Sequence, residues 1–208
     1  MNAPCILLNG AGLYDLSRGE YLATHTVDRE IMERIVKCVL SVRADACIQV
    51  FSGHEIYETN PDQRDDPYSV MEKFPVIKLP LEEIPEPALK LLVAHTSPNL
   101  DAIYEAVMQV EGIEHFSVFR TCDWYLEFVA NGVNKGIALG DTRSRCKDAK
   151  TILAIGDFNN DLEMVALADI GAAPANAIDE VKSAAHIVLD VDNNQSCVAH
   201  FLKQTLGI

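Results

Sequence analysis

The stretch TILAIGDFNNDLEM, residues 151–164, constrains the fold more than any other part of the sequence. An apolar run without a polar face ends at Gly156 and Asp157, and Asn160 and Asp161 then open a segment with helical spacing. Strands that are apolar on both faces are typical of parallel sheets. Because ligands bind at the carboxyl ends of such strands in open α/β sheets, we expect a ligand site after this strand.

The whole C-terminal part alternates between strands and helices, which indicates right-handed crossovers and a parallel sheet. Strands are predicted at residues 151–155, 170–173 and 186–189, and helices at 135–149, 162–168, 178–185 and 197–206. A further apolar strand, residues 5–8, precedes the turn signal Asn9-Gly10.

The middle of the chain has a different, α+β pattern. Helices are predicted at residues 27–42 and 100–110, strands at 46–51, 74–79 and 89–94, a hairpin at 115–119 and 124–129, and a polar loop at 60–67. The sequence therefore predicts an α+β domain inserted into an α/β domain.

Composition narrows the range of partners. The formal net charge of −14 repels phosphate backbones, so nucleic acid is not an expected partner. We expect no membrane span, because no apolar run approaches about 18 residues. The six cysteines form no C-x-x-C pair and the N-terminus lacks a secretory pattern. We therefore expect a cytoplasmic protein with free thiols.

The polar residues after the strand have two interpretations. A carboxylate beside a glycine at a strand end, as at Asp157, is a natural ligand for Mg²⁺, whereas Asn160 or Asp161 alone would simply cap the next helix. The full G-D-x-x-N-D string favours the ligand site. Lys135 alone is typical of an exposed lysine, and Asn9-Gly10 alone of a turn.

In their order along the chain, these elements resemble the haloacid dehalogenase (HAD) superfamily, specifically its Cof-type phosphatases with a large α+β cap. The segments LNGA at 8–11 and LYD at 13–15 resemble the entry to the cap. YLE at 125–127 and GVNKG at 132–136 resemble the cap exit and the third motif, with Lys135 as its lysine, and 156–161 matches the fourth motif. GAA at 171–173, followed by Asn176-Ala177, resembles the segment after it.

The resemblance implies a fold and a reaction. The fold is an incomplete Rossmann-like parallel sheet, α/β in class, with residues 1–16 and 131–208 as the core domain and 17–130 as the inserted cap. The reaction is Mg²⁺-dependent hydrolysis of a small phosphomonoester such as a sugar phosphate, in which an aspartate attacks phosphorus.

The resemblance also implies the site residues. Lys135 would stabilise the charge on the phosphoryl group, and Asp157 would bind the metal. Asp161 would support the metal shell or orient Lys135. Asn9, Gly10 and Asn160 would form the substrate pocket and its loop.

The sequence departs from this family at its start. The first motif, D-x-D-G-T, which carries the nucleophile, and the second-motif Ser or Thr are both absent, which amounts to two strand–helix units or about 60 residues. We expect the strand before Gly156 to have an unpaired edge, which would allow pairing with a second copy. Three explanations stay open: a fragment, a sheet that closes differently, or another chain that fills the gap.

The segment HIVLDVD, residues 186–192, superficially resembles the missing first motif, but it lacks Gly-Thr and lies where the family has its last core strand. We interpret Asp190 and Asp192 as a polar strand end. A second function also stays open, since a cap with a Lys135/Asp157 half-site would suit a non-catalytic protein that binds a phosphorylated ligand or a metal.

Overall fold

The computed structural model describes residues 4–60 and 74–207, and the chain divides into two compact units. Unit 1 consists of Met1–Ala23 together with Asn134–Ile208, and unit 2 is Thr24–Val133. The fold class predicted from the sequence is confirmed, because unit 1 contains a parallel sheet with helices and unit 2 is an α+β insertion. The unit boundaries fall at residues 23 and 133, whereas the sequence interpretation drew them at 16 and 130.

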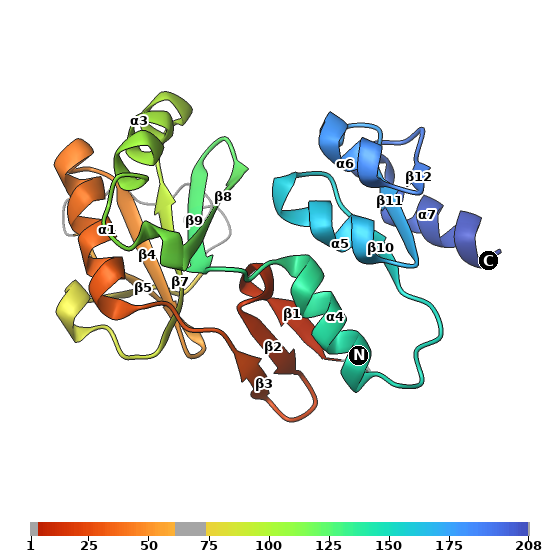
Figure 1. Cartoon of the computed structure of the whole chain (residues 1–208), viewed down its shortest axis with the longest axis horizontal. Coiled ribbons are helices and arrows are strands. Elements are labelled where there is room, and N and C mark those ends of the chain that lie inside the picture. The colour runs from red at the N-terminus through yellow and green to blue at the C-terminus, as the bar shows by residue number, and fades with distance from the viewer. Residues whose placement is uncertain (1–3, 61–73, 208) are drawn as a thin grey trace. The chain divides into compact units, whose positions relative to one another are not determined.

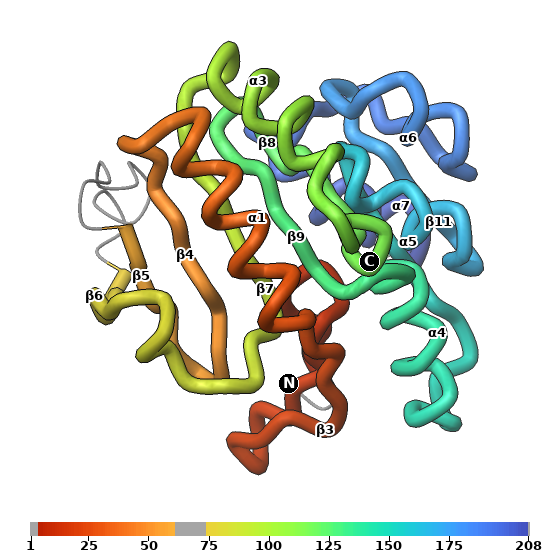
Figure 2. The backbone as a smooth tube through the Cα atoms, turned by 60° about the vertical axis from the view of Figure 1, so that its left-hand side comes forward, coloured from red at the N-terminus to blue at the C-terminus, as the bar shows by residue number. Residues whose placement is uncertain are grey.

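Unit 2 is built on a six-stranded sheet in the order β6-β5-β4-β7-β9-β8. Its strands are β4 (Cys47–Ser52), β5 (Glu55–Glu58), β6 (Ile77–Lys78), β7 (Ala88–Ala94), β8 (Phe116–Cys122) and β9 (Tyr125–Ala130). Its helices are α1 (Arg29–Val42) and α3 (Ser97–Val107), with the 3₁₀ turns η2 (Leu81–Glu83) and η3 (Ile113–His115). Figure 2 shows α1 and α3 in front of β4, β7 and β9.

The helix α1 forms where the sequence predicts it, because its cap and its apolar face agree. The Asp28 carboxylate accepts a hydrogen bond from the Ile31 backbone N–H at 3.0 Å, which satisfies one of the free donors of the first turn. Ile31, Ile35 and Val39 are buried at helical spacing. They pack in one cluster with side chains of the sheet such as Phe128, so this face of the sheet holds the core of unit 2.

Alternation along the strands turns other side chains of unit 2 to the opposite face of the sheet. There the Lys90 ammonium lies 2.9 Å from the Glu127 carboxylate and above the ring of Phe51. Gln49 donates to the Glu58 carboxylate at 3.2 Å. These charged groups are buried, and each has the hydrogen-bonded partner that burial demands.

Unit 1 contains two three-stranded sheets, β1-β2-β3 and β10-β11-β12 (Figure 1). The first sheet consists of β1 (Cys5–Leu7), β2 (Gly12–Asp15) and β3 (Glu20–Thr24). The second consists of β10 (Leu153–Ile155), β11 (Ile170–Ala173) and β12 (Ile187–Val188). The helices are α4 (Lys135–Arg145), α5 (Leu162–Leu167), α6 (Asp179–Ala184) and α7 (Cys197–Leu206), and the 3₁₀ turns are η1 (Leu8–Gly10), η4 (Asn159–Asp161) and η5 (Asn193–Gln195).

The second sheet of unit 1 is the parallel sheet that the alternating pattern predicted, since β10 pairs with β11 and β11 with β12, both in parallel. Val165 and Val181, from α5 and α6, pack in one cluster with the sheet, and Phe201 of α7 packs in another. Within the described residues β10 has β11 as its single strand partner, so its other edge is unpaired, as expected.

The strand β1 does not pair with the open edge of β10. It pairs antiparallel with β2 through a tight turn in which Leu8, Asn9 and Gly10 all have left-handed backbone angles, with φ of 53°, 56° and 104°. A Cβ atom on Gly10 would lie 2.4 Å from the backbone oxygen of Asn134, so glycine is needed here for both its φ and its size.

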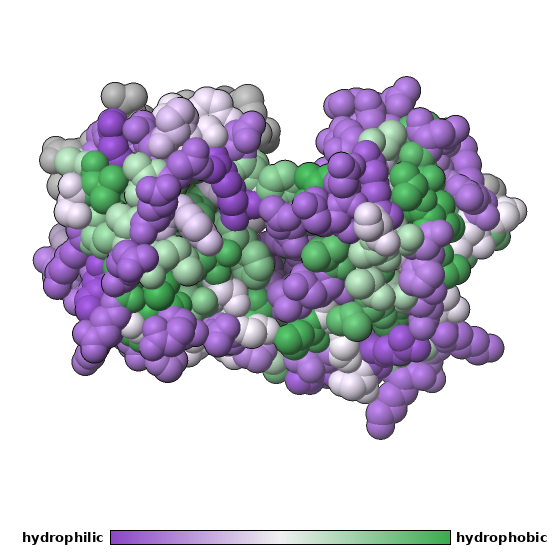
Figure 3. Space-filling model, turned by 45° about the horizontal axis from the view of Figure 1, so that its top comes forward, coloured by the Kyte–Doolittle hydropathy of each residue, from purple (hydrophilic) through white to green (hydrophobic). Residues whose placement is uncertain are grey.

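Other features of the chain follow the composition. None of the six cysteines forms a disulfide bond. No helix in the described part of the chain has the length and apolar character needed to cross a membrane. Hydrophilic residues form most of the outermost surface on the face shown in Figure 3, in keeping with the charge of −14. The predicted polar loop at 60–67 lies, apart from Asn60, outside the described residues.

Candidate functional site

Lys135 is held at the first position of a capped helix. The Asn134 side chain accepts a hydrogen bond from the Ile137 N–H at 2.8 Å, which fixes the start of α4. The ammonium group of Lys135 then lies 2.5 Å from Oδ1 of Asp161. The Lys135 side chain keeps 29% of its surface exposed, so it can still reach a ligand while it is paired.

Asp161 connects the lysine to the loop that follows β10. Its side chain is 9% exposed, and its two oxygens have different partners. Oδ1 contacts Lys135, and Oδ2 accepts the backbone N–H of Asp157 at 3.1 Å. Because both oxygens are engaged inside the protein, this geometry favours Asp161 as the group that orients Lys135 over Asp161 as a direct metal ligand.

Gly156 permits this arrangement by having no side chain. A Cβ atom at this position would lie 2.3 Å from the Cβ of Asp161, a distance that real side chains do not tolerate. The backbone around it is anchored, since Gly156 N–H donates to the Ala172 carbonyl and the Asp157 carbonyl accepts from Ile178. The glycine thus brings residues 157 and 161 together.

Asp157 has the carboxylate best placed for a ligand. It is half-buried, it lines a cavity, and within the described residues no hydrogen bond or ion pair engages its side-chain oxygens. Carboxylate oxygens with free lone pairs are the ligands that Mg²⁺ prefers.

Asn9 and Asn160 approach one another from distant parts of the sequence. The Asn160 amide donates to Oδ1 of Asn9 at 3.3 Å, a bond that ties the β1–β2 turn to η4. Gly10 is buried against α4 and does not line the cavity. Of the three predicted substrate residues, Asn9 reaches the cavity directly and Asn160 supports it.

A cavity of about 340 Å³ joins the predicted residues within unit 1. Asn9, Lys135, Asp157 and Asp161 all line it, so residues from η1, α4 and the loop after β10 share one space. The separate resemblances at the two ends of unit 1 therefore converge on one candidate site.

Gly156, which the sequence analysis singled out, also lines this cavity. The sequence analysis did not assign the other walls, which are formed by Ile6, Ile155, Met164, Pro174, Asn193, Cys197 and Val198. Asn193 is positioned by its backbone N–H, which donates to the Asn176 side chain at 3.0 Å. These side chains come from separate segments of unit 1, and local sequence patterns do not reveal which distant segments will share a wall.

The charges in this cavity favour a cation. Lys135 contributes one positive charge, and Asp157 and Asp161 contribute two negative ones, so the three side chains carry a net charge of −1. A dianionic phosphate would be repelled unless a cation balanced it. Within the described residues no cluster of three His, Cys, Asp or Glu side chains could enclose a metal. The single free carboxylate of Asp157 nevertheless suits Mg²⁺, which keeps several waters and binds through one or two carboxylates and the substrate's phosphate.

Of the acidic pair at residues 190 and 192, Asp192 has a structural role as a helix cap. Asp192 accepts the Asn194 N–H at 2.8 Å, and Gln195 accepts the Asp192 N–H at 3.0 Å, which together form a capping box at η5. Neither Asp190 nor Asp192 lines the cavity. The interpretation of Asp192 as a structural polar residue agrees with these contacts, and Asp190 lies outside the lining of the cavity.

Comparisons with known proteins agree with this geometry. Over residues 1–202 the sequence matches the haloacid dehalogenase-like hydrolase family. The 5-amino-6-(5-phospho-D-ribitylamino)uracil phosphatase YitU of Bacillus subtilis is 32% identical over 137 residues, which cover 61% of this chain and 47% of YitU. A phosphoglycolate phosphatase of Methanopyrus kandleri is 44% identical over 59 residues, 28% of this chain and 25% of that protein.

The solved structures extend the likeness to the fold. A haloacid dehalogenase-like hydrolase from Bacteroides thetaiotaomicron superimposes with a TM-score of 0.76 at 25% identity, covering 94% of this chain and 74% of that one. The chain spans less than two thirds of the length of the first curated relatives that it matches. The family match nonetheless covers nearly all of the chain, which confirms the resemblance drawn from its motifs: this protein belongs to the haloacid dehalogenase-like hydrolases.

Proposed function

We propose that the cavity after β10 is the phosphoryl- and metal-binding site of a Mg²⁺-dependent phosphatase. The observation that carries this proposal is the meeting of Lys135, Asp157 and Asp161 in one cavity of unit 1. Those three residues supply a cation for phosphoryl oxygens, an open carboxylate for a metal, and a carboxylate that holds the cation in place.

Each residue has a separate task in this proposal. Lys135 neutralises charge on the transferring phosphoryl group as a point charge, and Asp161 fixes its ammonium. Asp157 holds Mg²⁺, which when bound would offset the remaining charge on the phosphoryl oxygens. Asn9, fixed by Asn160, contributes an amide to the wall of the pocket.

The substrate class is a small phosphomonoester such as a sugar phosphate. A cavity of about 340 Å³ suits a small ligand, and the relative YitU is named for a phosphorylated ribityl compound. We further propose that the inserted α+β unit acts as the cap that sets substrate choice. We also propose that the protein works in the reducing cytoplasm, where cysteines outside disulfide bonds persist.

This proposal does not identify the nucleophile that attacks phosphorus. The 208 residues contain no D-x-D-G-T motif, and the family's route to hydrolysis uses that motif's aspartate as nucleophile. We therefore expect these residues by themselves to bind phosphate far better than they hydrolyse its esters. The same observation favours a second function, a non-catalytic protein that binds a phosphorylated ligand.

One experiment tests the site and separates the two functions. Binding of inorganic phosphate is measured by calorimetry with and without Mg²⁺, and hydrolysis of p-nitrophenyl phosphate is measured in parallel. We expect Mg²⁺ to be required for phosphate binding, and Asp157→Asn to weaken that binding about tenfold or more, since it removes the metal's charged ligand. Asp190→Asn is the matched control and should bind as the unchanged protein does.

The outcomes have separate meanings. Phosphate binding that is equally Mg²⁺-dependent in the Asp157→Asn protein would refute the site assignment. Turnover that disappears with Asp157→Asn supports the phosphatase. Mg²⁺-dependent binding without turnover by these 208 residues supports the non-catalytic function only if a version of the chain extended by a D-x-D-G-T segment is equally inactive, whereas turnover by the extended version alone supports the phosphatase.

A further inference from the structure

One wall of the candidate phosphoryl cavity is formed by residues that follow β11. Pro174, Cys197 and Val198 bring apolar or weakly polar groups to this wall, and Asn193 brings an amide. Within the described residues no hydrogen bond engages the exposed side chain of Asn193. Because an amide carries two donor hydrogens and one acceptor oxygen, this wall offers a ligand one neutral hydrogen-bonding group.

The backbone around Asn193 is anchored to the turn that follows β11. The Asn193 N–H donates to Oδ1 of Asn176 in that turn, at 3.0 Å. The N–H of Ala175 donates to the Val191 carbonyl at 2.9 Å. The capping box at Asp192 then fixes the start of η5. Because these contacts do not involve a ligand, the position from which the Asn193 side chain reaches the cavity is preorganised.

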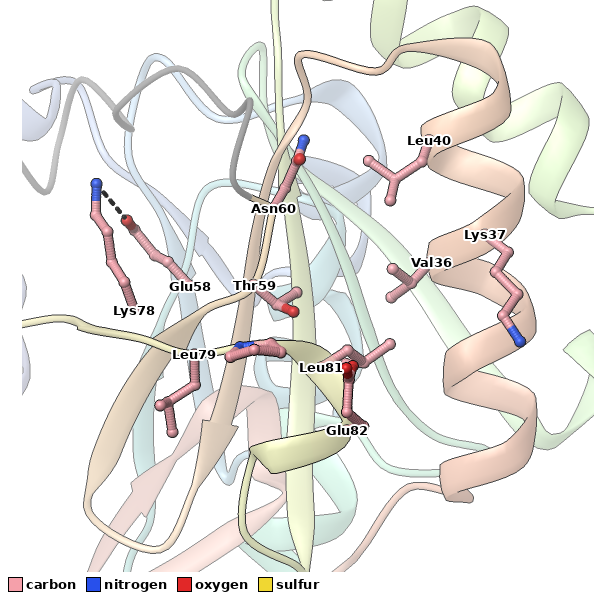
Figure 4. Close-up of a pocket in the computed structure, with 11 residues that line it drawn as sticks. Val36, Lys37, Leu40, Glu58, Thr59, Asn60, Lys78, Leu79, Leu81 and Glu82 are labelled. Carbon is pink, nitrogen blue, oxygen red and sulfur yellow. Dashed lines mark ion pairs between the residues drawn. The ribbon is translucent and has the colours of Figure 1, made fainter.

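The larger cavity of unit 2, of about 520 Å³, provides a contrast. The amide and charged side chains on its strand side are already engaged within the protein. The Glu58 carboxylate lies 3.7 Å from the Lys78 ammonium (Figure 4). The Asn60 amide donates to two backbone carbonyl oxygens, at 2.7 and 2.9 Å. Asn60 therefore serves the fold, whereas Asn193 has no comparable partner among the residues that the structure describes.

The phosphoryl cavity has few donors that are available to a ligand. Ionised phosphoryl oxygens only accept hydrogen bonds, so each of them needs a donor or a cation. The Lys135 ammonium is shared with Asp161, and the Asn160 amide already donates to Asn9. The Asn193 amide can donate without breaking a bond inside the protein. A phosphoryl group is the ligand that gains most from such a donor.

We propose that Asn193 is a further ligand-binding residue of this site, whose side-chain amide donates a hydrogen bond to a phosphoryl oxygen, and that Asn176 is the positioning residue that holds it there. This inference rests on the proposed function, because it takes a phosphoryl group as the ligand of the cavity. The net charge of −1 on Lys135, Asp157 and Asp161 favours a donor over a further acceptor at this wall.

The test is binding of inorganic phosphate to the 208-residue chain, measured by calorimetry in the presence of Mg²⁺. We expect Asn193→Ala to weaken phosphate binding about tenfold, the effect of one hydrogen bond to a charged group. Asn193→Asp should weaken it further, because it replaces the donor with a negative charge. Asn194→Ala is the matched control, since Asn194 is equally exposed, belongs to η5 and does not line the cavity. All three variants should keep the melting temperature of the unchanged protein.

Two variants of Asn176 test its positioning role. Asn176→Ala removes the acceptor for the Asn193 N–H and should weaken phosphate binding about threefold, the effect of one neutral hydrogen bond. Asn176→Asp keeps an acceptor oxygen and should restore binding. In the Asn193→Ala background, Asn176→Ala should cause no further loss, because its effect is transmitted through the Asn193 side chain.

Undiminished phosphate binding by Asn193→Ala would overturn the proposal. So would tighter binding by Asn193→Asp, since the residue would then act toward a cation as an acceptor. Additive losses in the double variant would refute the role of Asn176. The inference and the proposed function fail separately: if Asp157→Asn weakens phosphate binding and Asn193→Ala does not, only the inference is wrong, whereas an unchanged protein that binds no phosphate would refute both.

Discussion

At the scale of single residues, the geometry of the candidate site depends on an absent side chain. Asp157 and Asp161 are four residues apart, and their link is the 3.1 Å hydrogen bond from the Asp157 N–H to the Asp161 carboxylate. That bond requires the backbone at Gly156 to pass against the side chain of Asp161. The arrangement of the two aspartates therefore depends on Gly156 as much as on the two carboxylates themselves.

Replacing Gly156 with alanine tests this dependence. The added Cβ would lie 2.3 Å from the Asp161 Cβ, so we expect the loop to shift, the protein to lose about 1–3 kcal/mol of unfolding free energy, and phosphate binding to weaken. The matched control is Gly140→Ala in α4, where nothing lies within 4 Å of the new Cβ. Alanine is the better helix former there and should add about 0.5–1 kcal/mol.

Urea unfolding measures the unfolding free energies of the two variants, and calorimetry measures their phosphate binding. If Gly156→Ala were as stable as Gly140→Ala and bound phosphate equally well, the close approach of the loop to Asp161 would not be what positions the site.

At the scale of elements, the sequence predicted best where apolar spacing persists over several residues. The bounds of β11 and α7 agree with those predicted, and α1 begins two residues later than expected. The predicted strand at 74–79 shrinks to β6, because Pro75 and Pro80 lack the N–H that a ladder needs. The strands β3 and β5 were missed, and no residue of β3 is fully buried, so it shows no apolar face.

The site likewise has parts that local sequence predicts and parts that depend on the packing of distant segments. The residues after β10 could be predicted because strand, glycine and carboxylates lie within one short local motif. Asn9 was expected in the pocket from the family resemblance and not from local spacing, and Asn193 was not expected there, because both positions depend on how η1 and η5 pack against that loop. The spacing of residues within one motif does not predict which distant turn will line the cavity.

Asp169, between α5 and β11, joins three elements through one carboxylate. It accepts the backbone N–H of Ile152 at 2.8 Å and pairs with Arg143 of α4 at 3.1 Å. The backbone hydrogen bond first, and then Arg143, hold the pKa of Asp169 below its ordinary value of 3.8. A carboxyl group with a lowered folded-state pKa stabilises the fold above its unfolded pKa, and this contribution is lost as the pH falls through the folded value.

We therefore expect Asp169→Asn to reduce the acid sensitivity of unit 1. Urea unfolding measured from pH 6 down to pH 2.5 should show a shallower loss of stability below about pH 4 than in the unchanged protein, together with a lower stability at neutral pH. Asp148→Asn, at an exposed position after α4, is the control and should follow the unchanged curve. Parallel curves for Asp169→Asn and the unchanged protein would contradict the assigned contacts.

At the scale of the whole molecule, the two units differ in how their cores are built. Unit 2 is one continuous segment whose core runs from α1 and α3 into the six-stranded sheet, with Ile35, Ile48, Leu91 and Phe128 essentially inaccessible to solvent. Unit 1 is assembled from two segments, and its parallel sheet is flanked by two small clusters around Val165 and Phe201. Stability is therefore expected to be uneven along the chain.

This asymmetry predicts that residues 24–133 fold by themselves. A single segment of domain size with its own core meets the physical requirement for independent folding. We expect the isolated segment to unfold cooperatively in urea, with coincident circular dichroism and fluorescence transitions. Phe128→Ala should remove about 3–5 kcal/mol, because it empties a fully buried site. A gradual, non-cooperative transition, or one that Phe128→Ala does not move, would mean that the core of unit 2 depends on the rest of the chain.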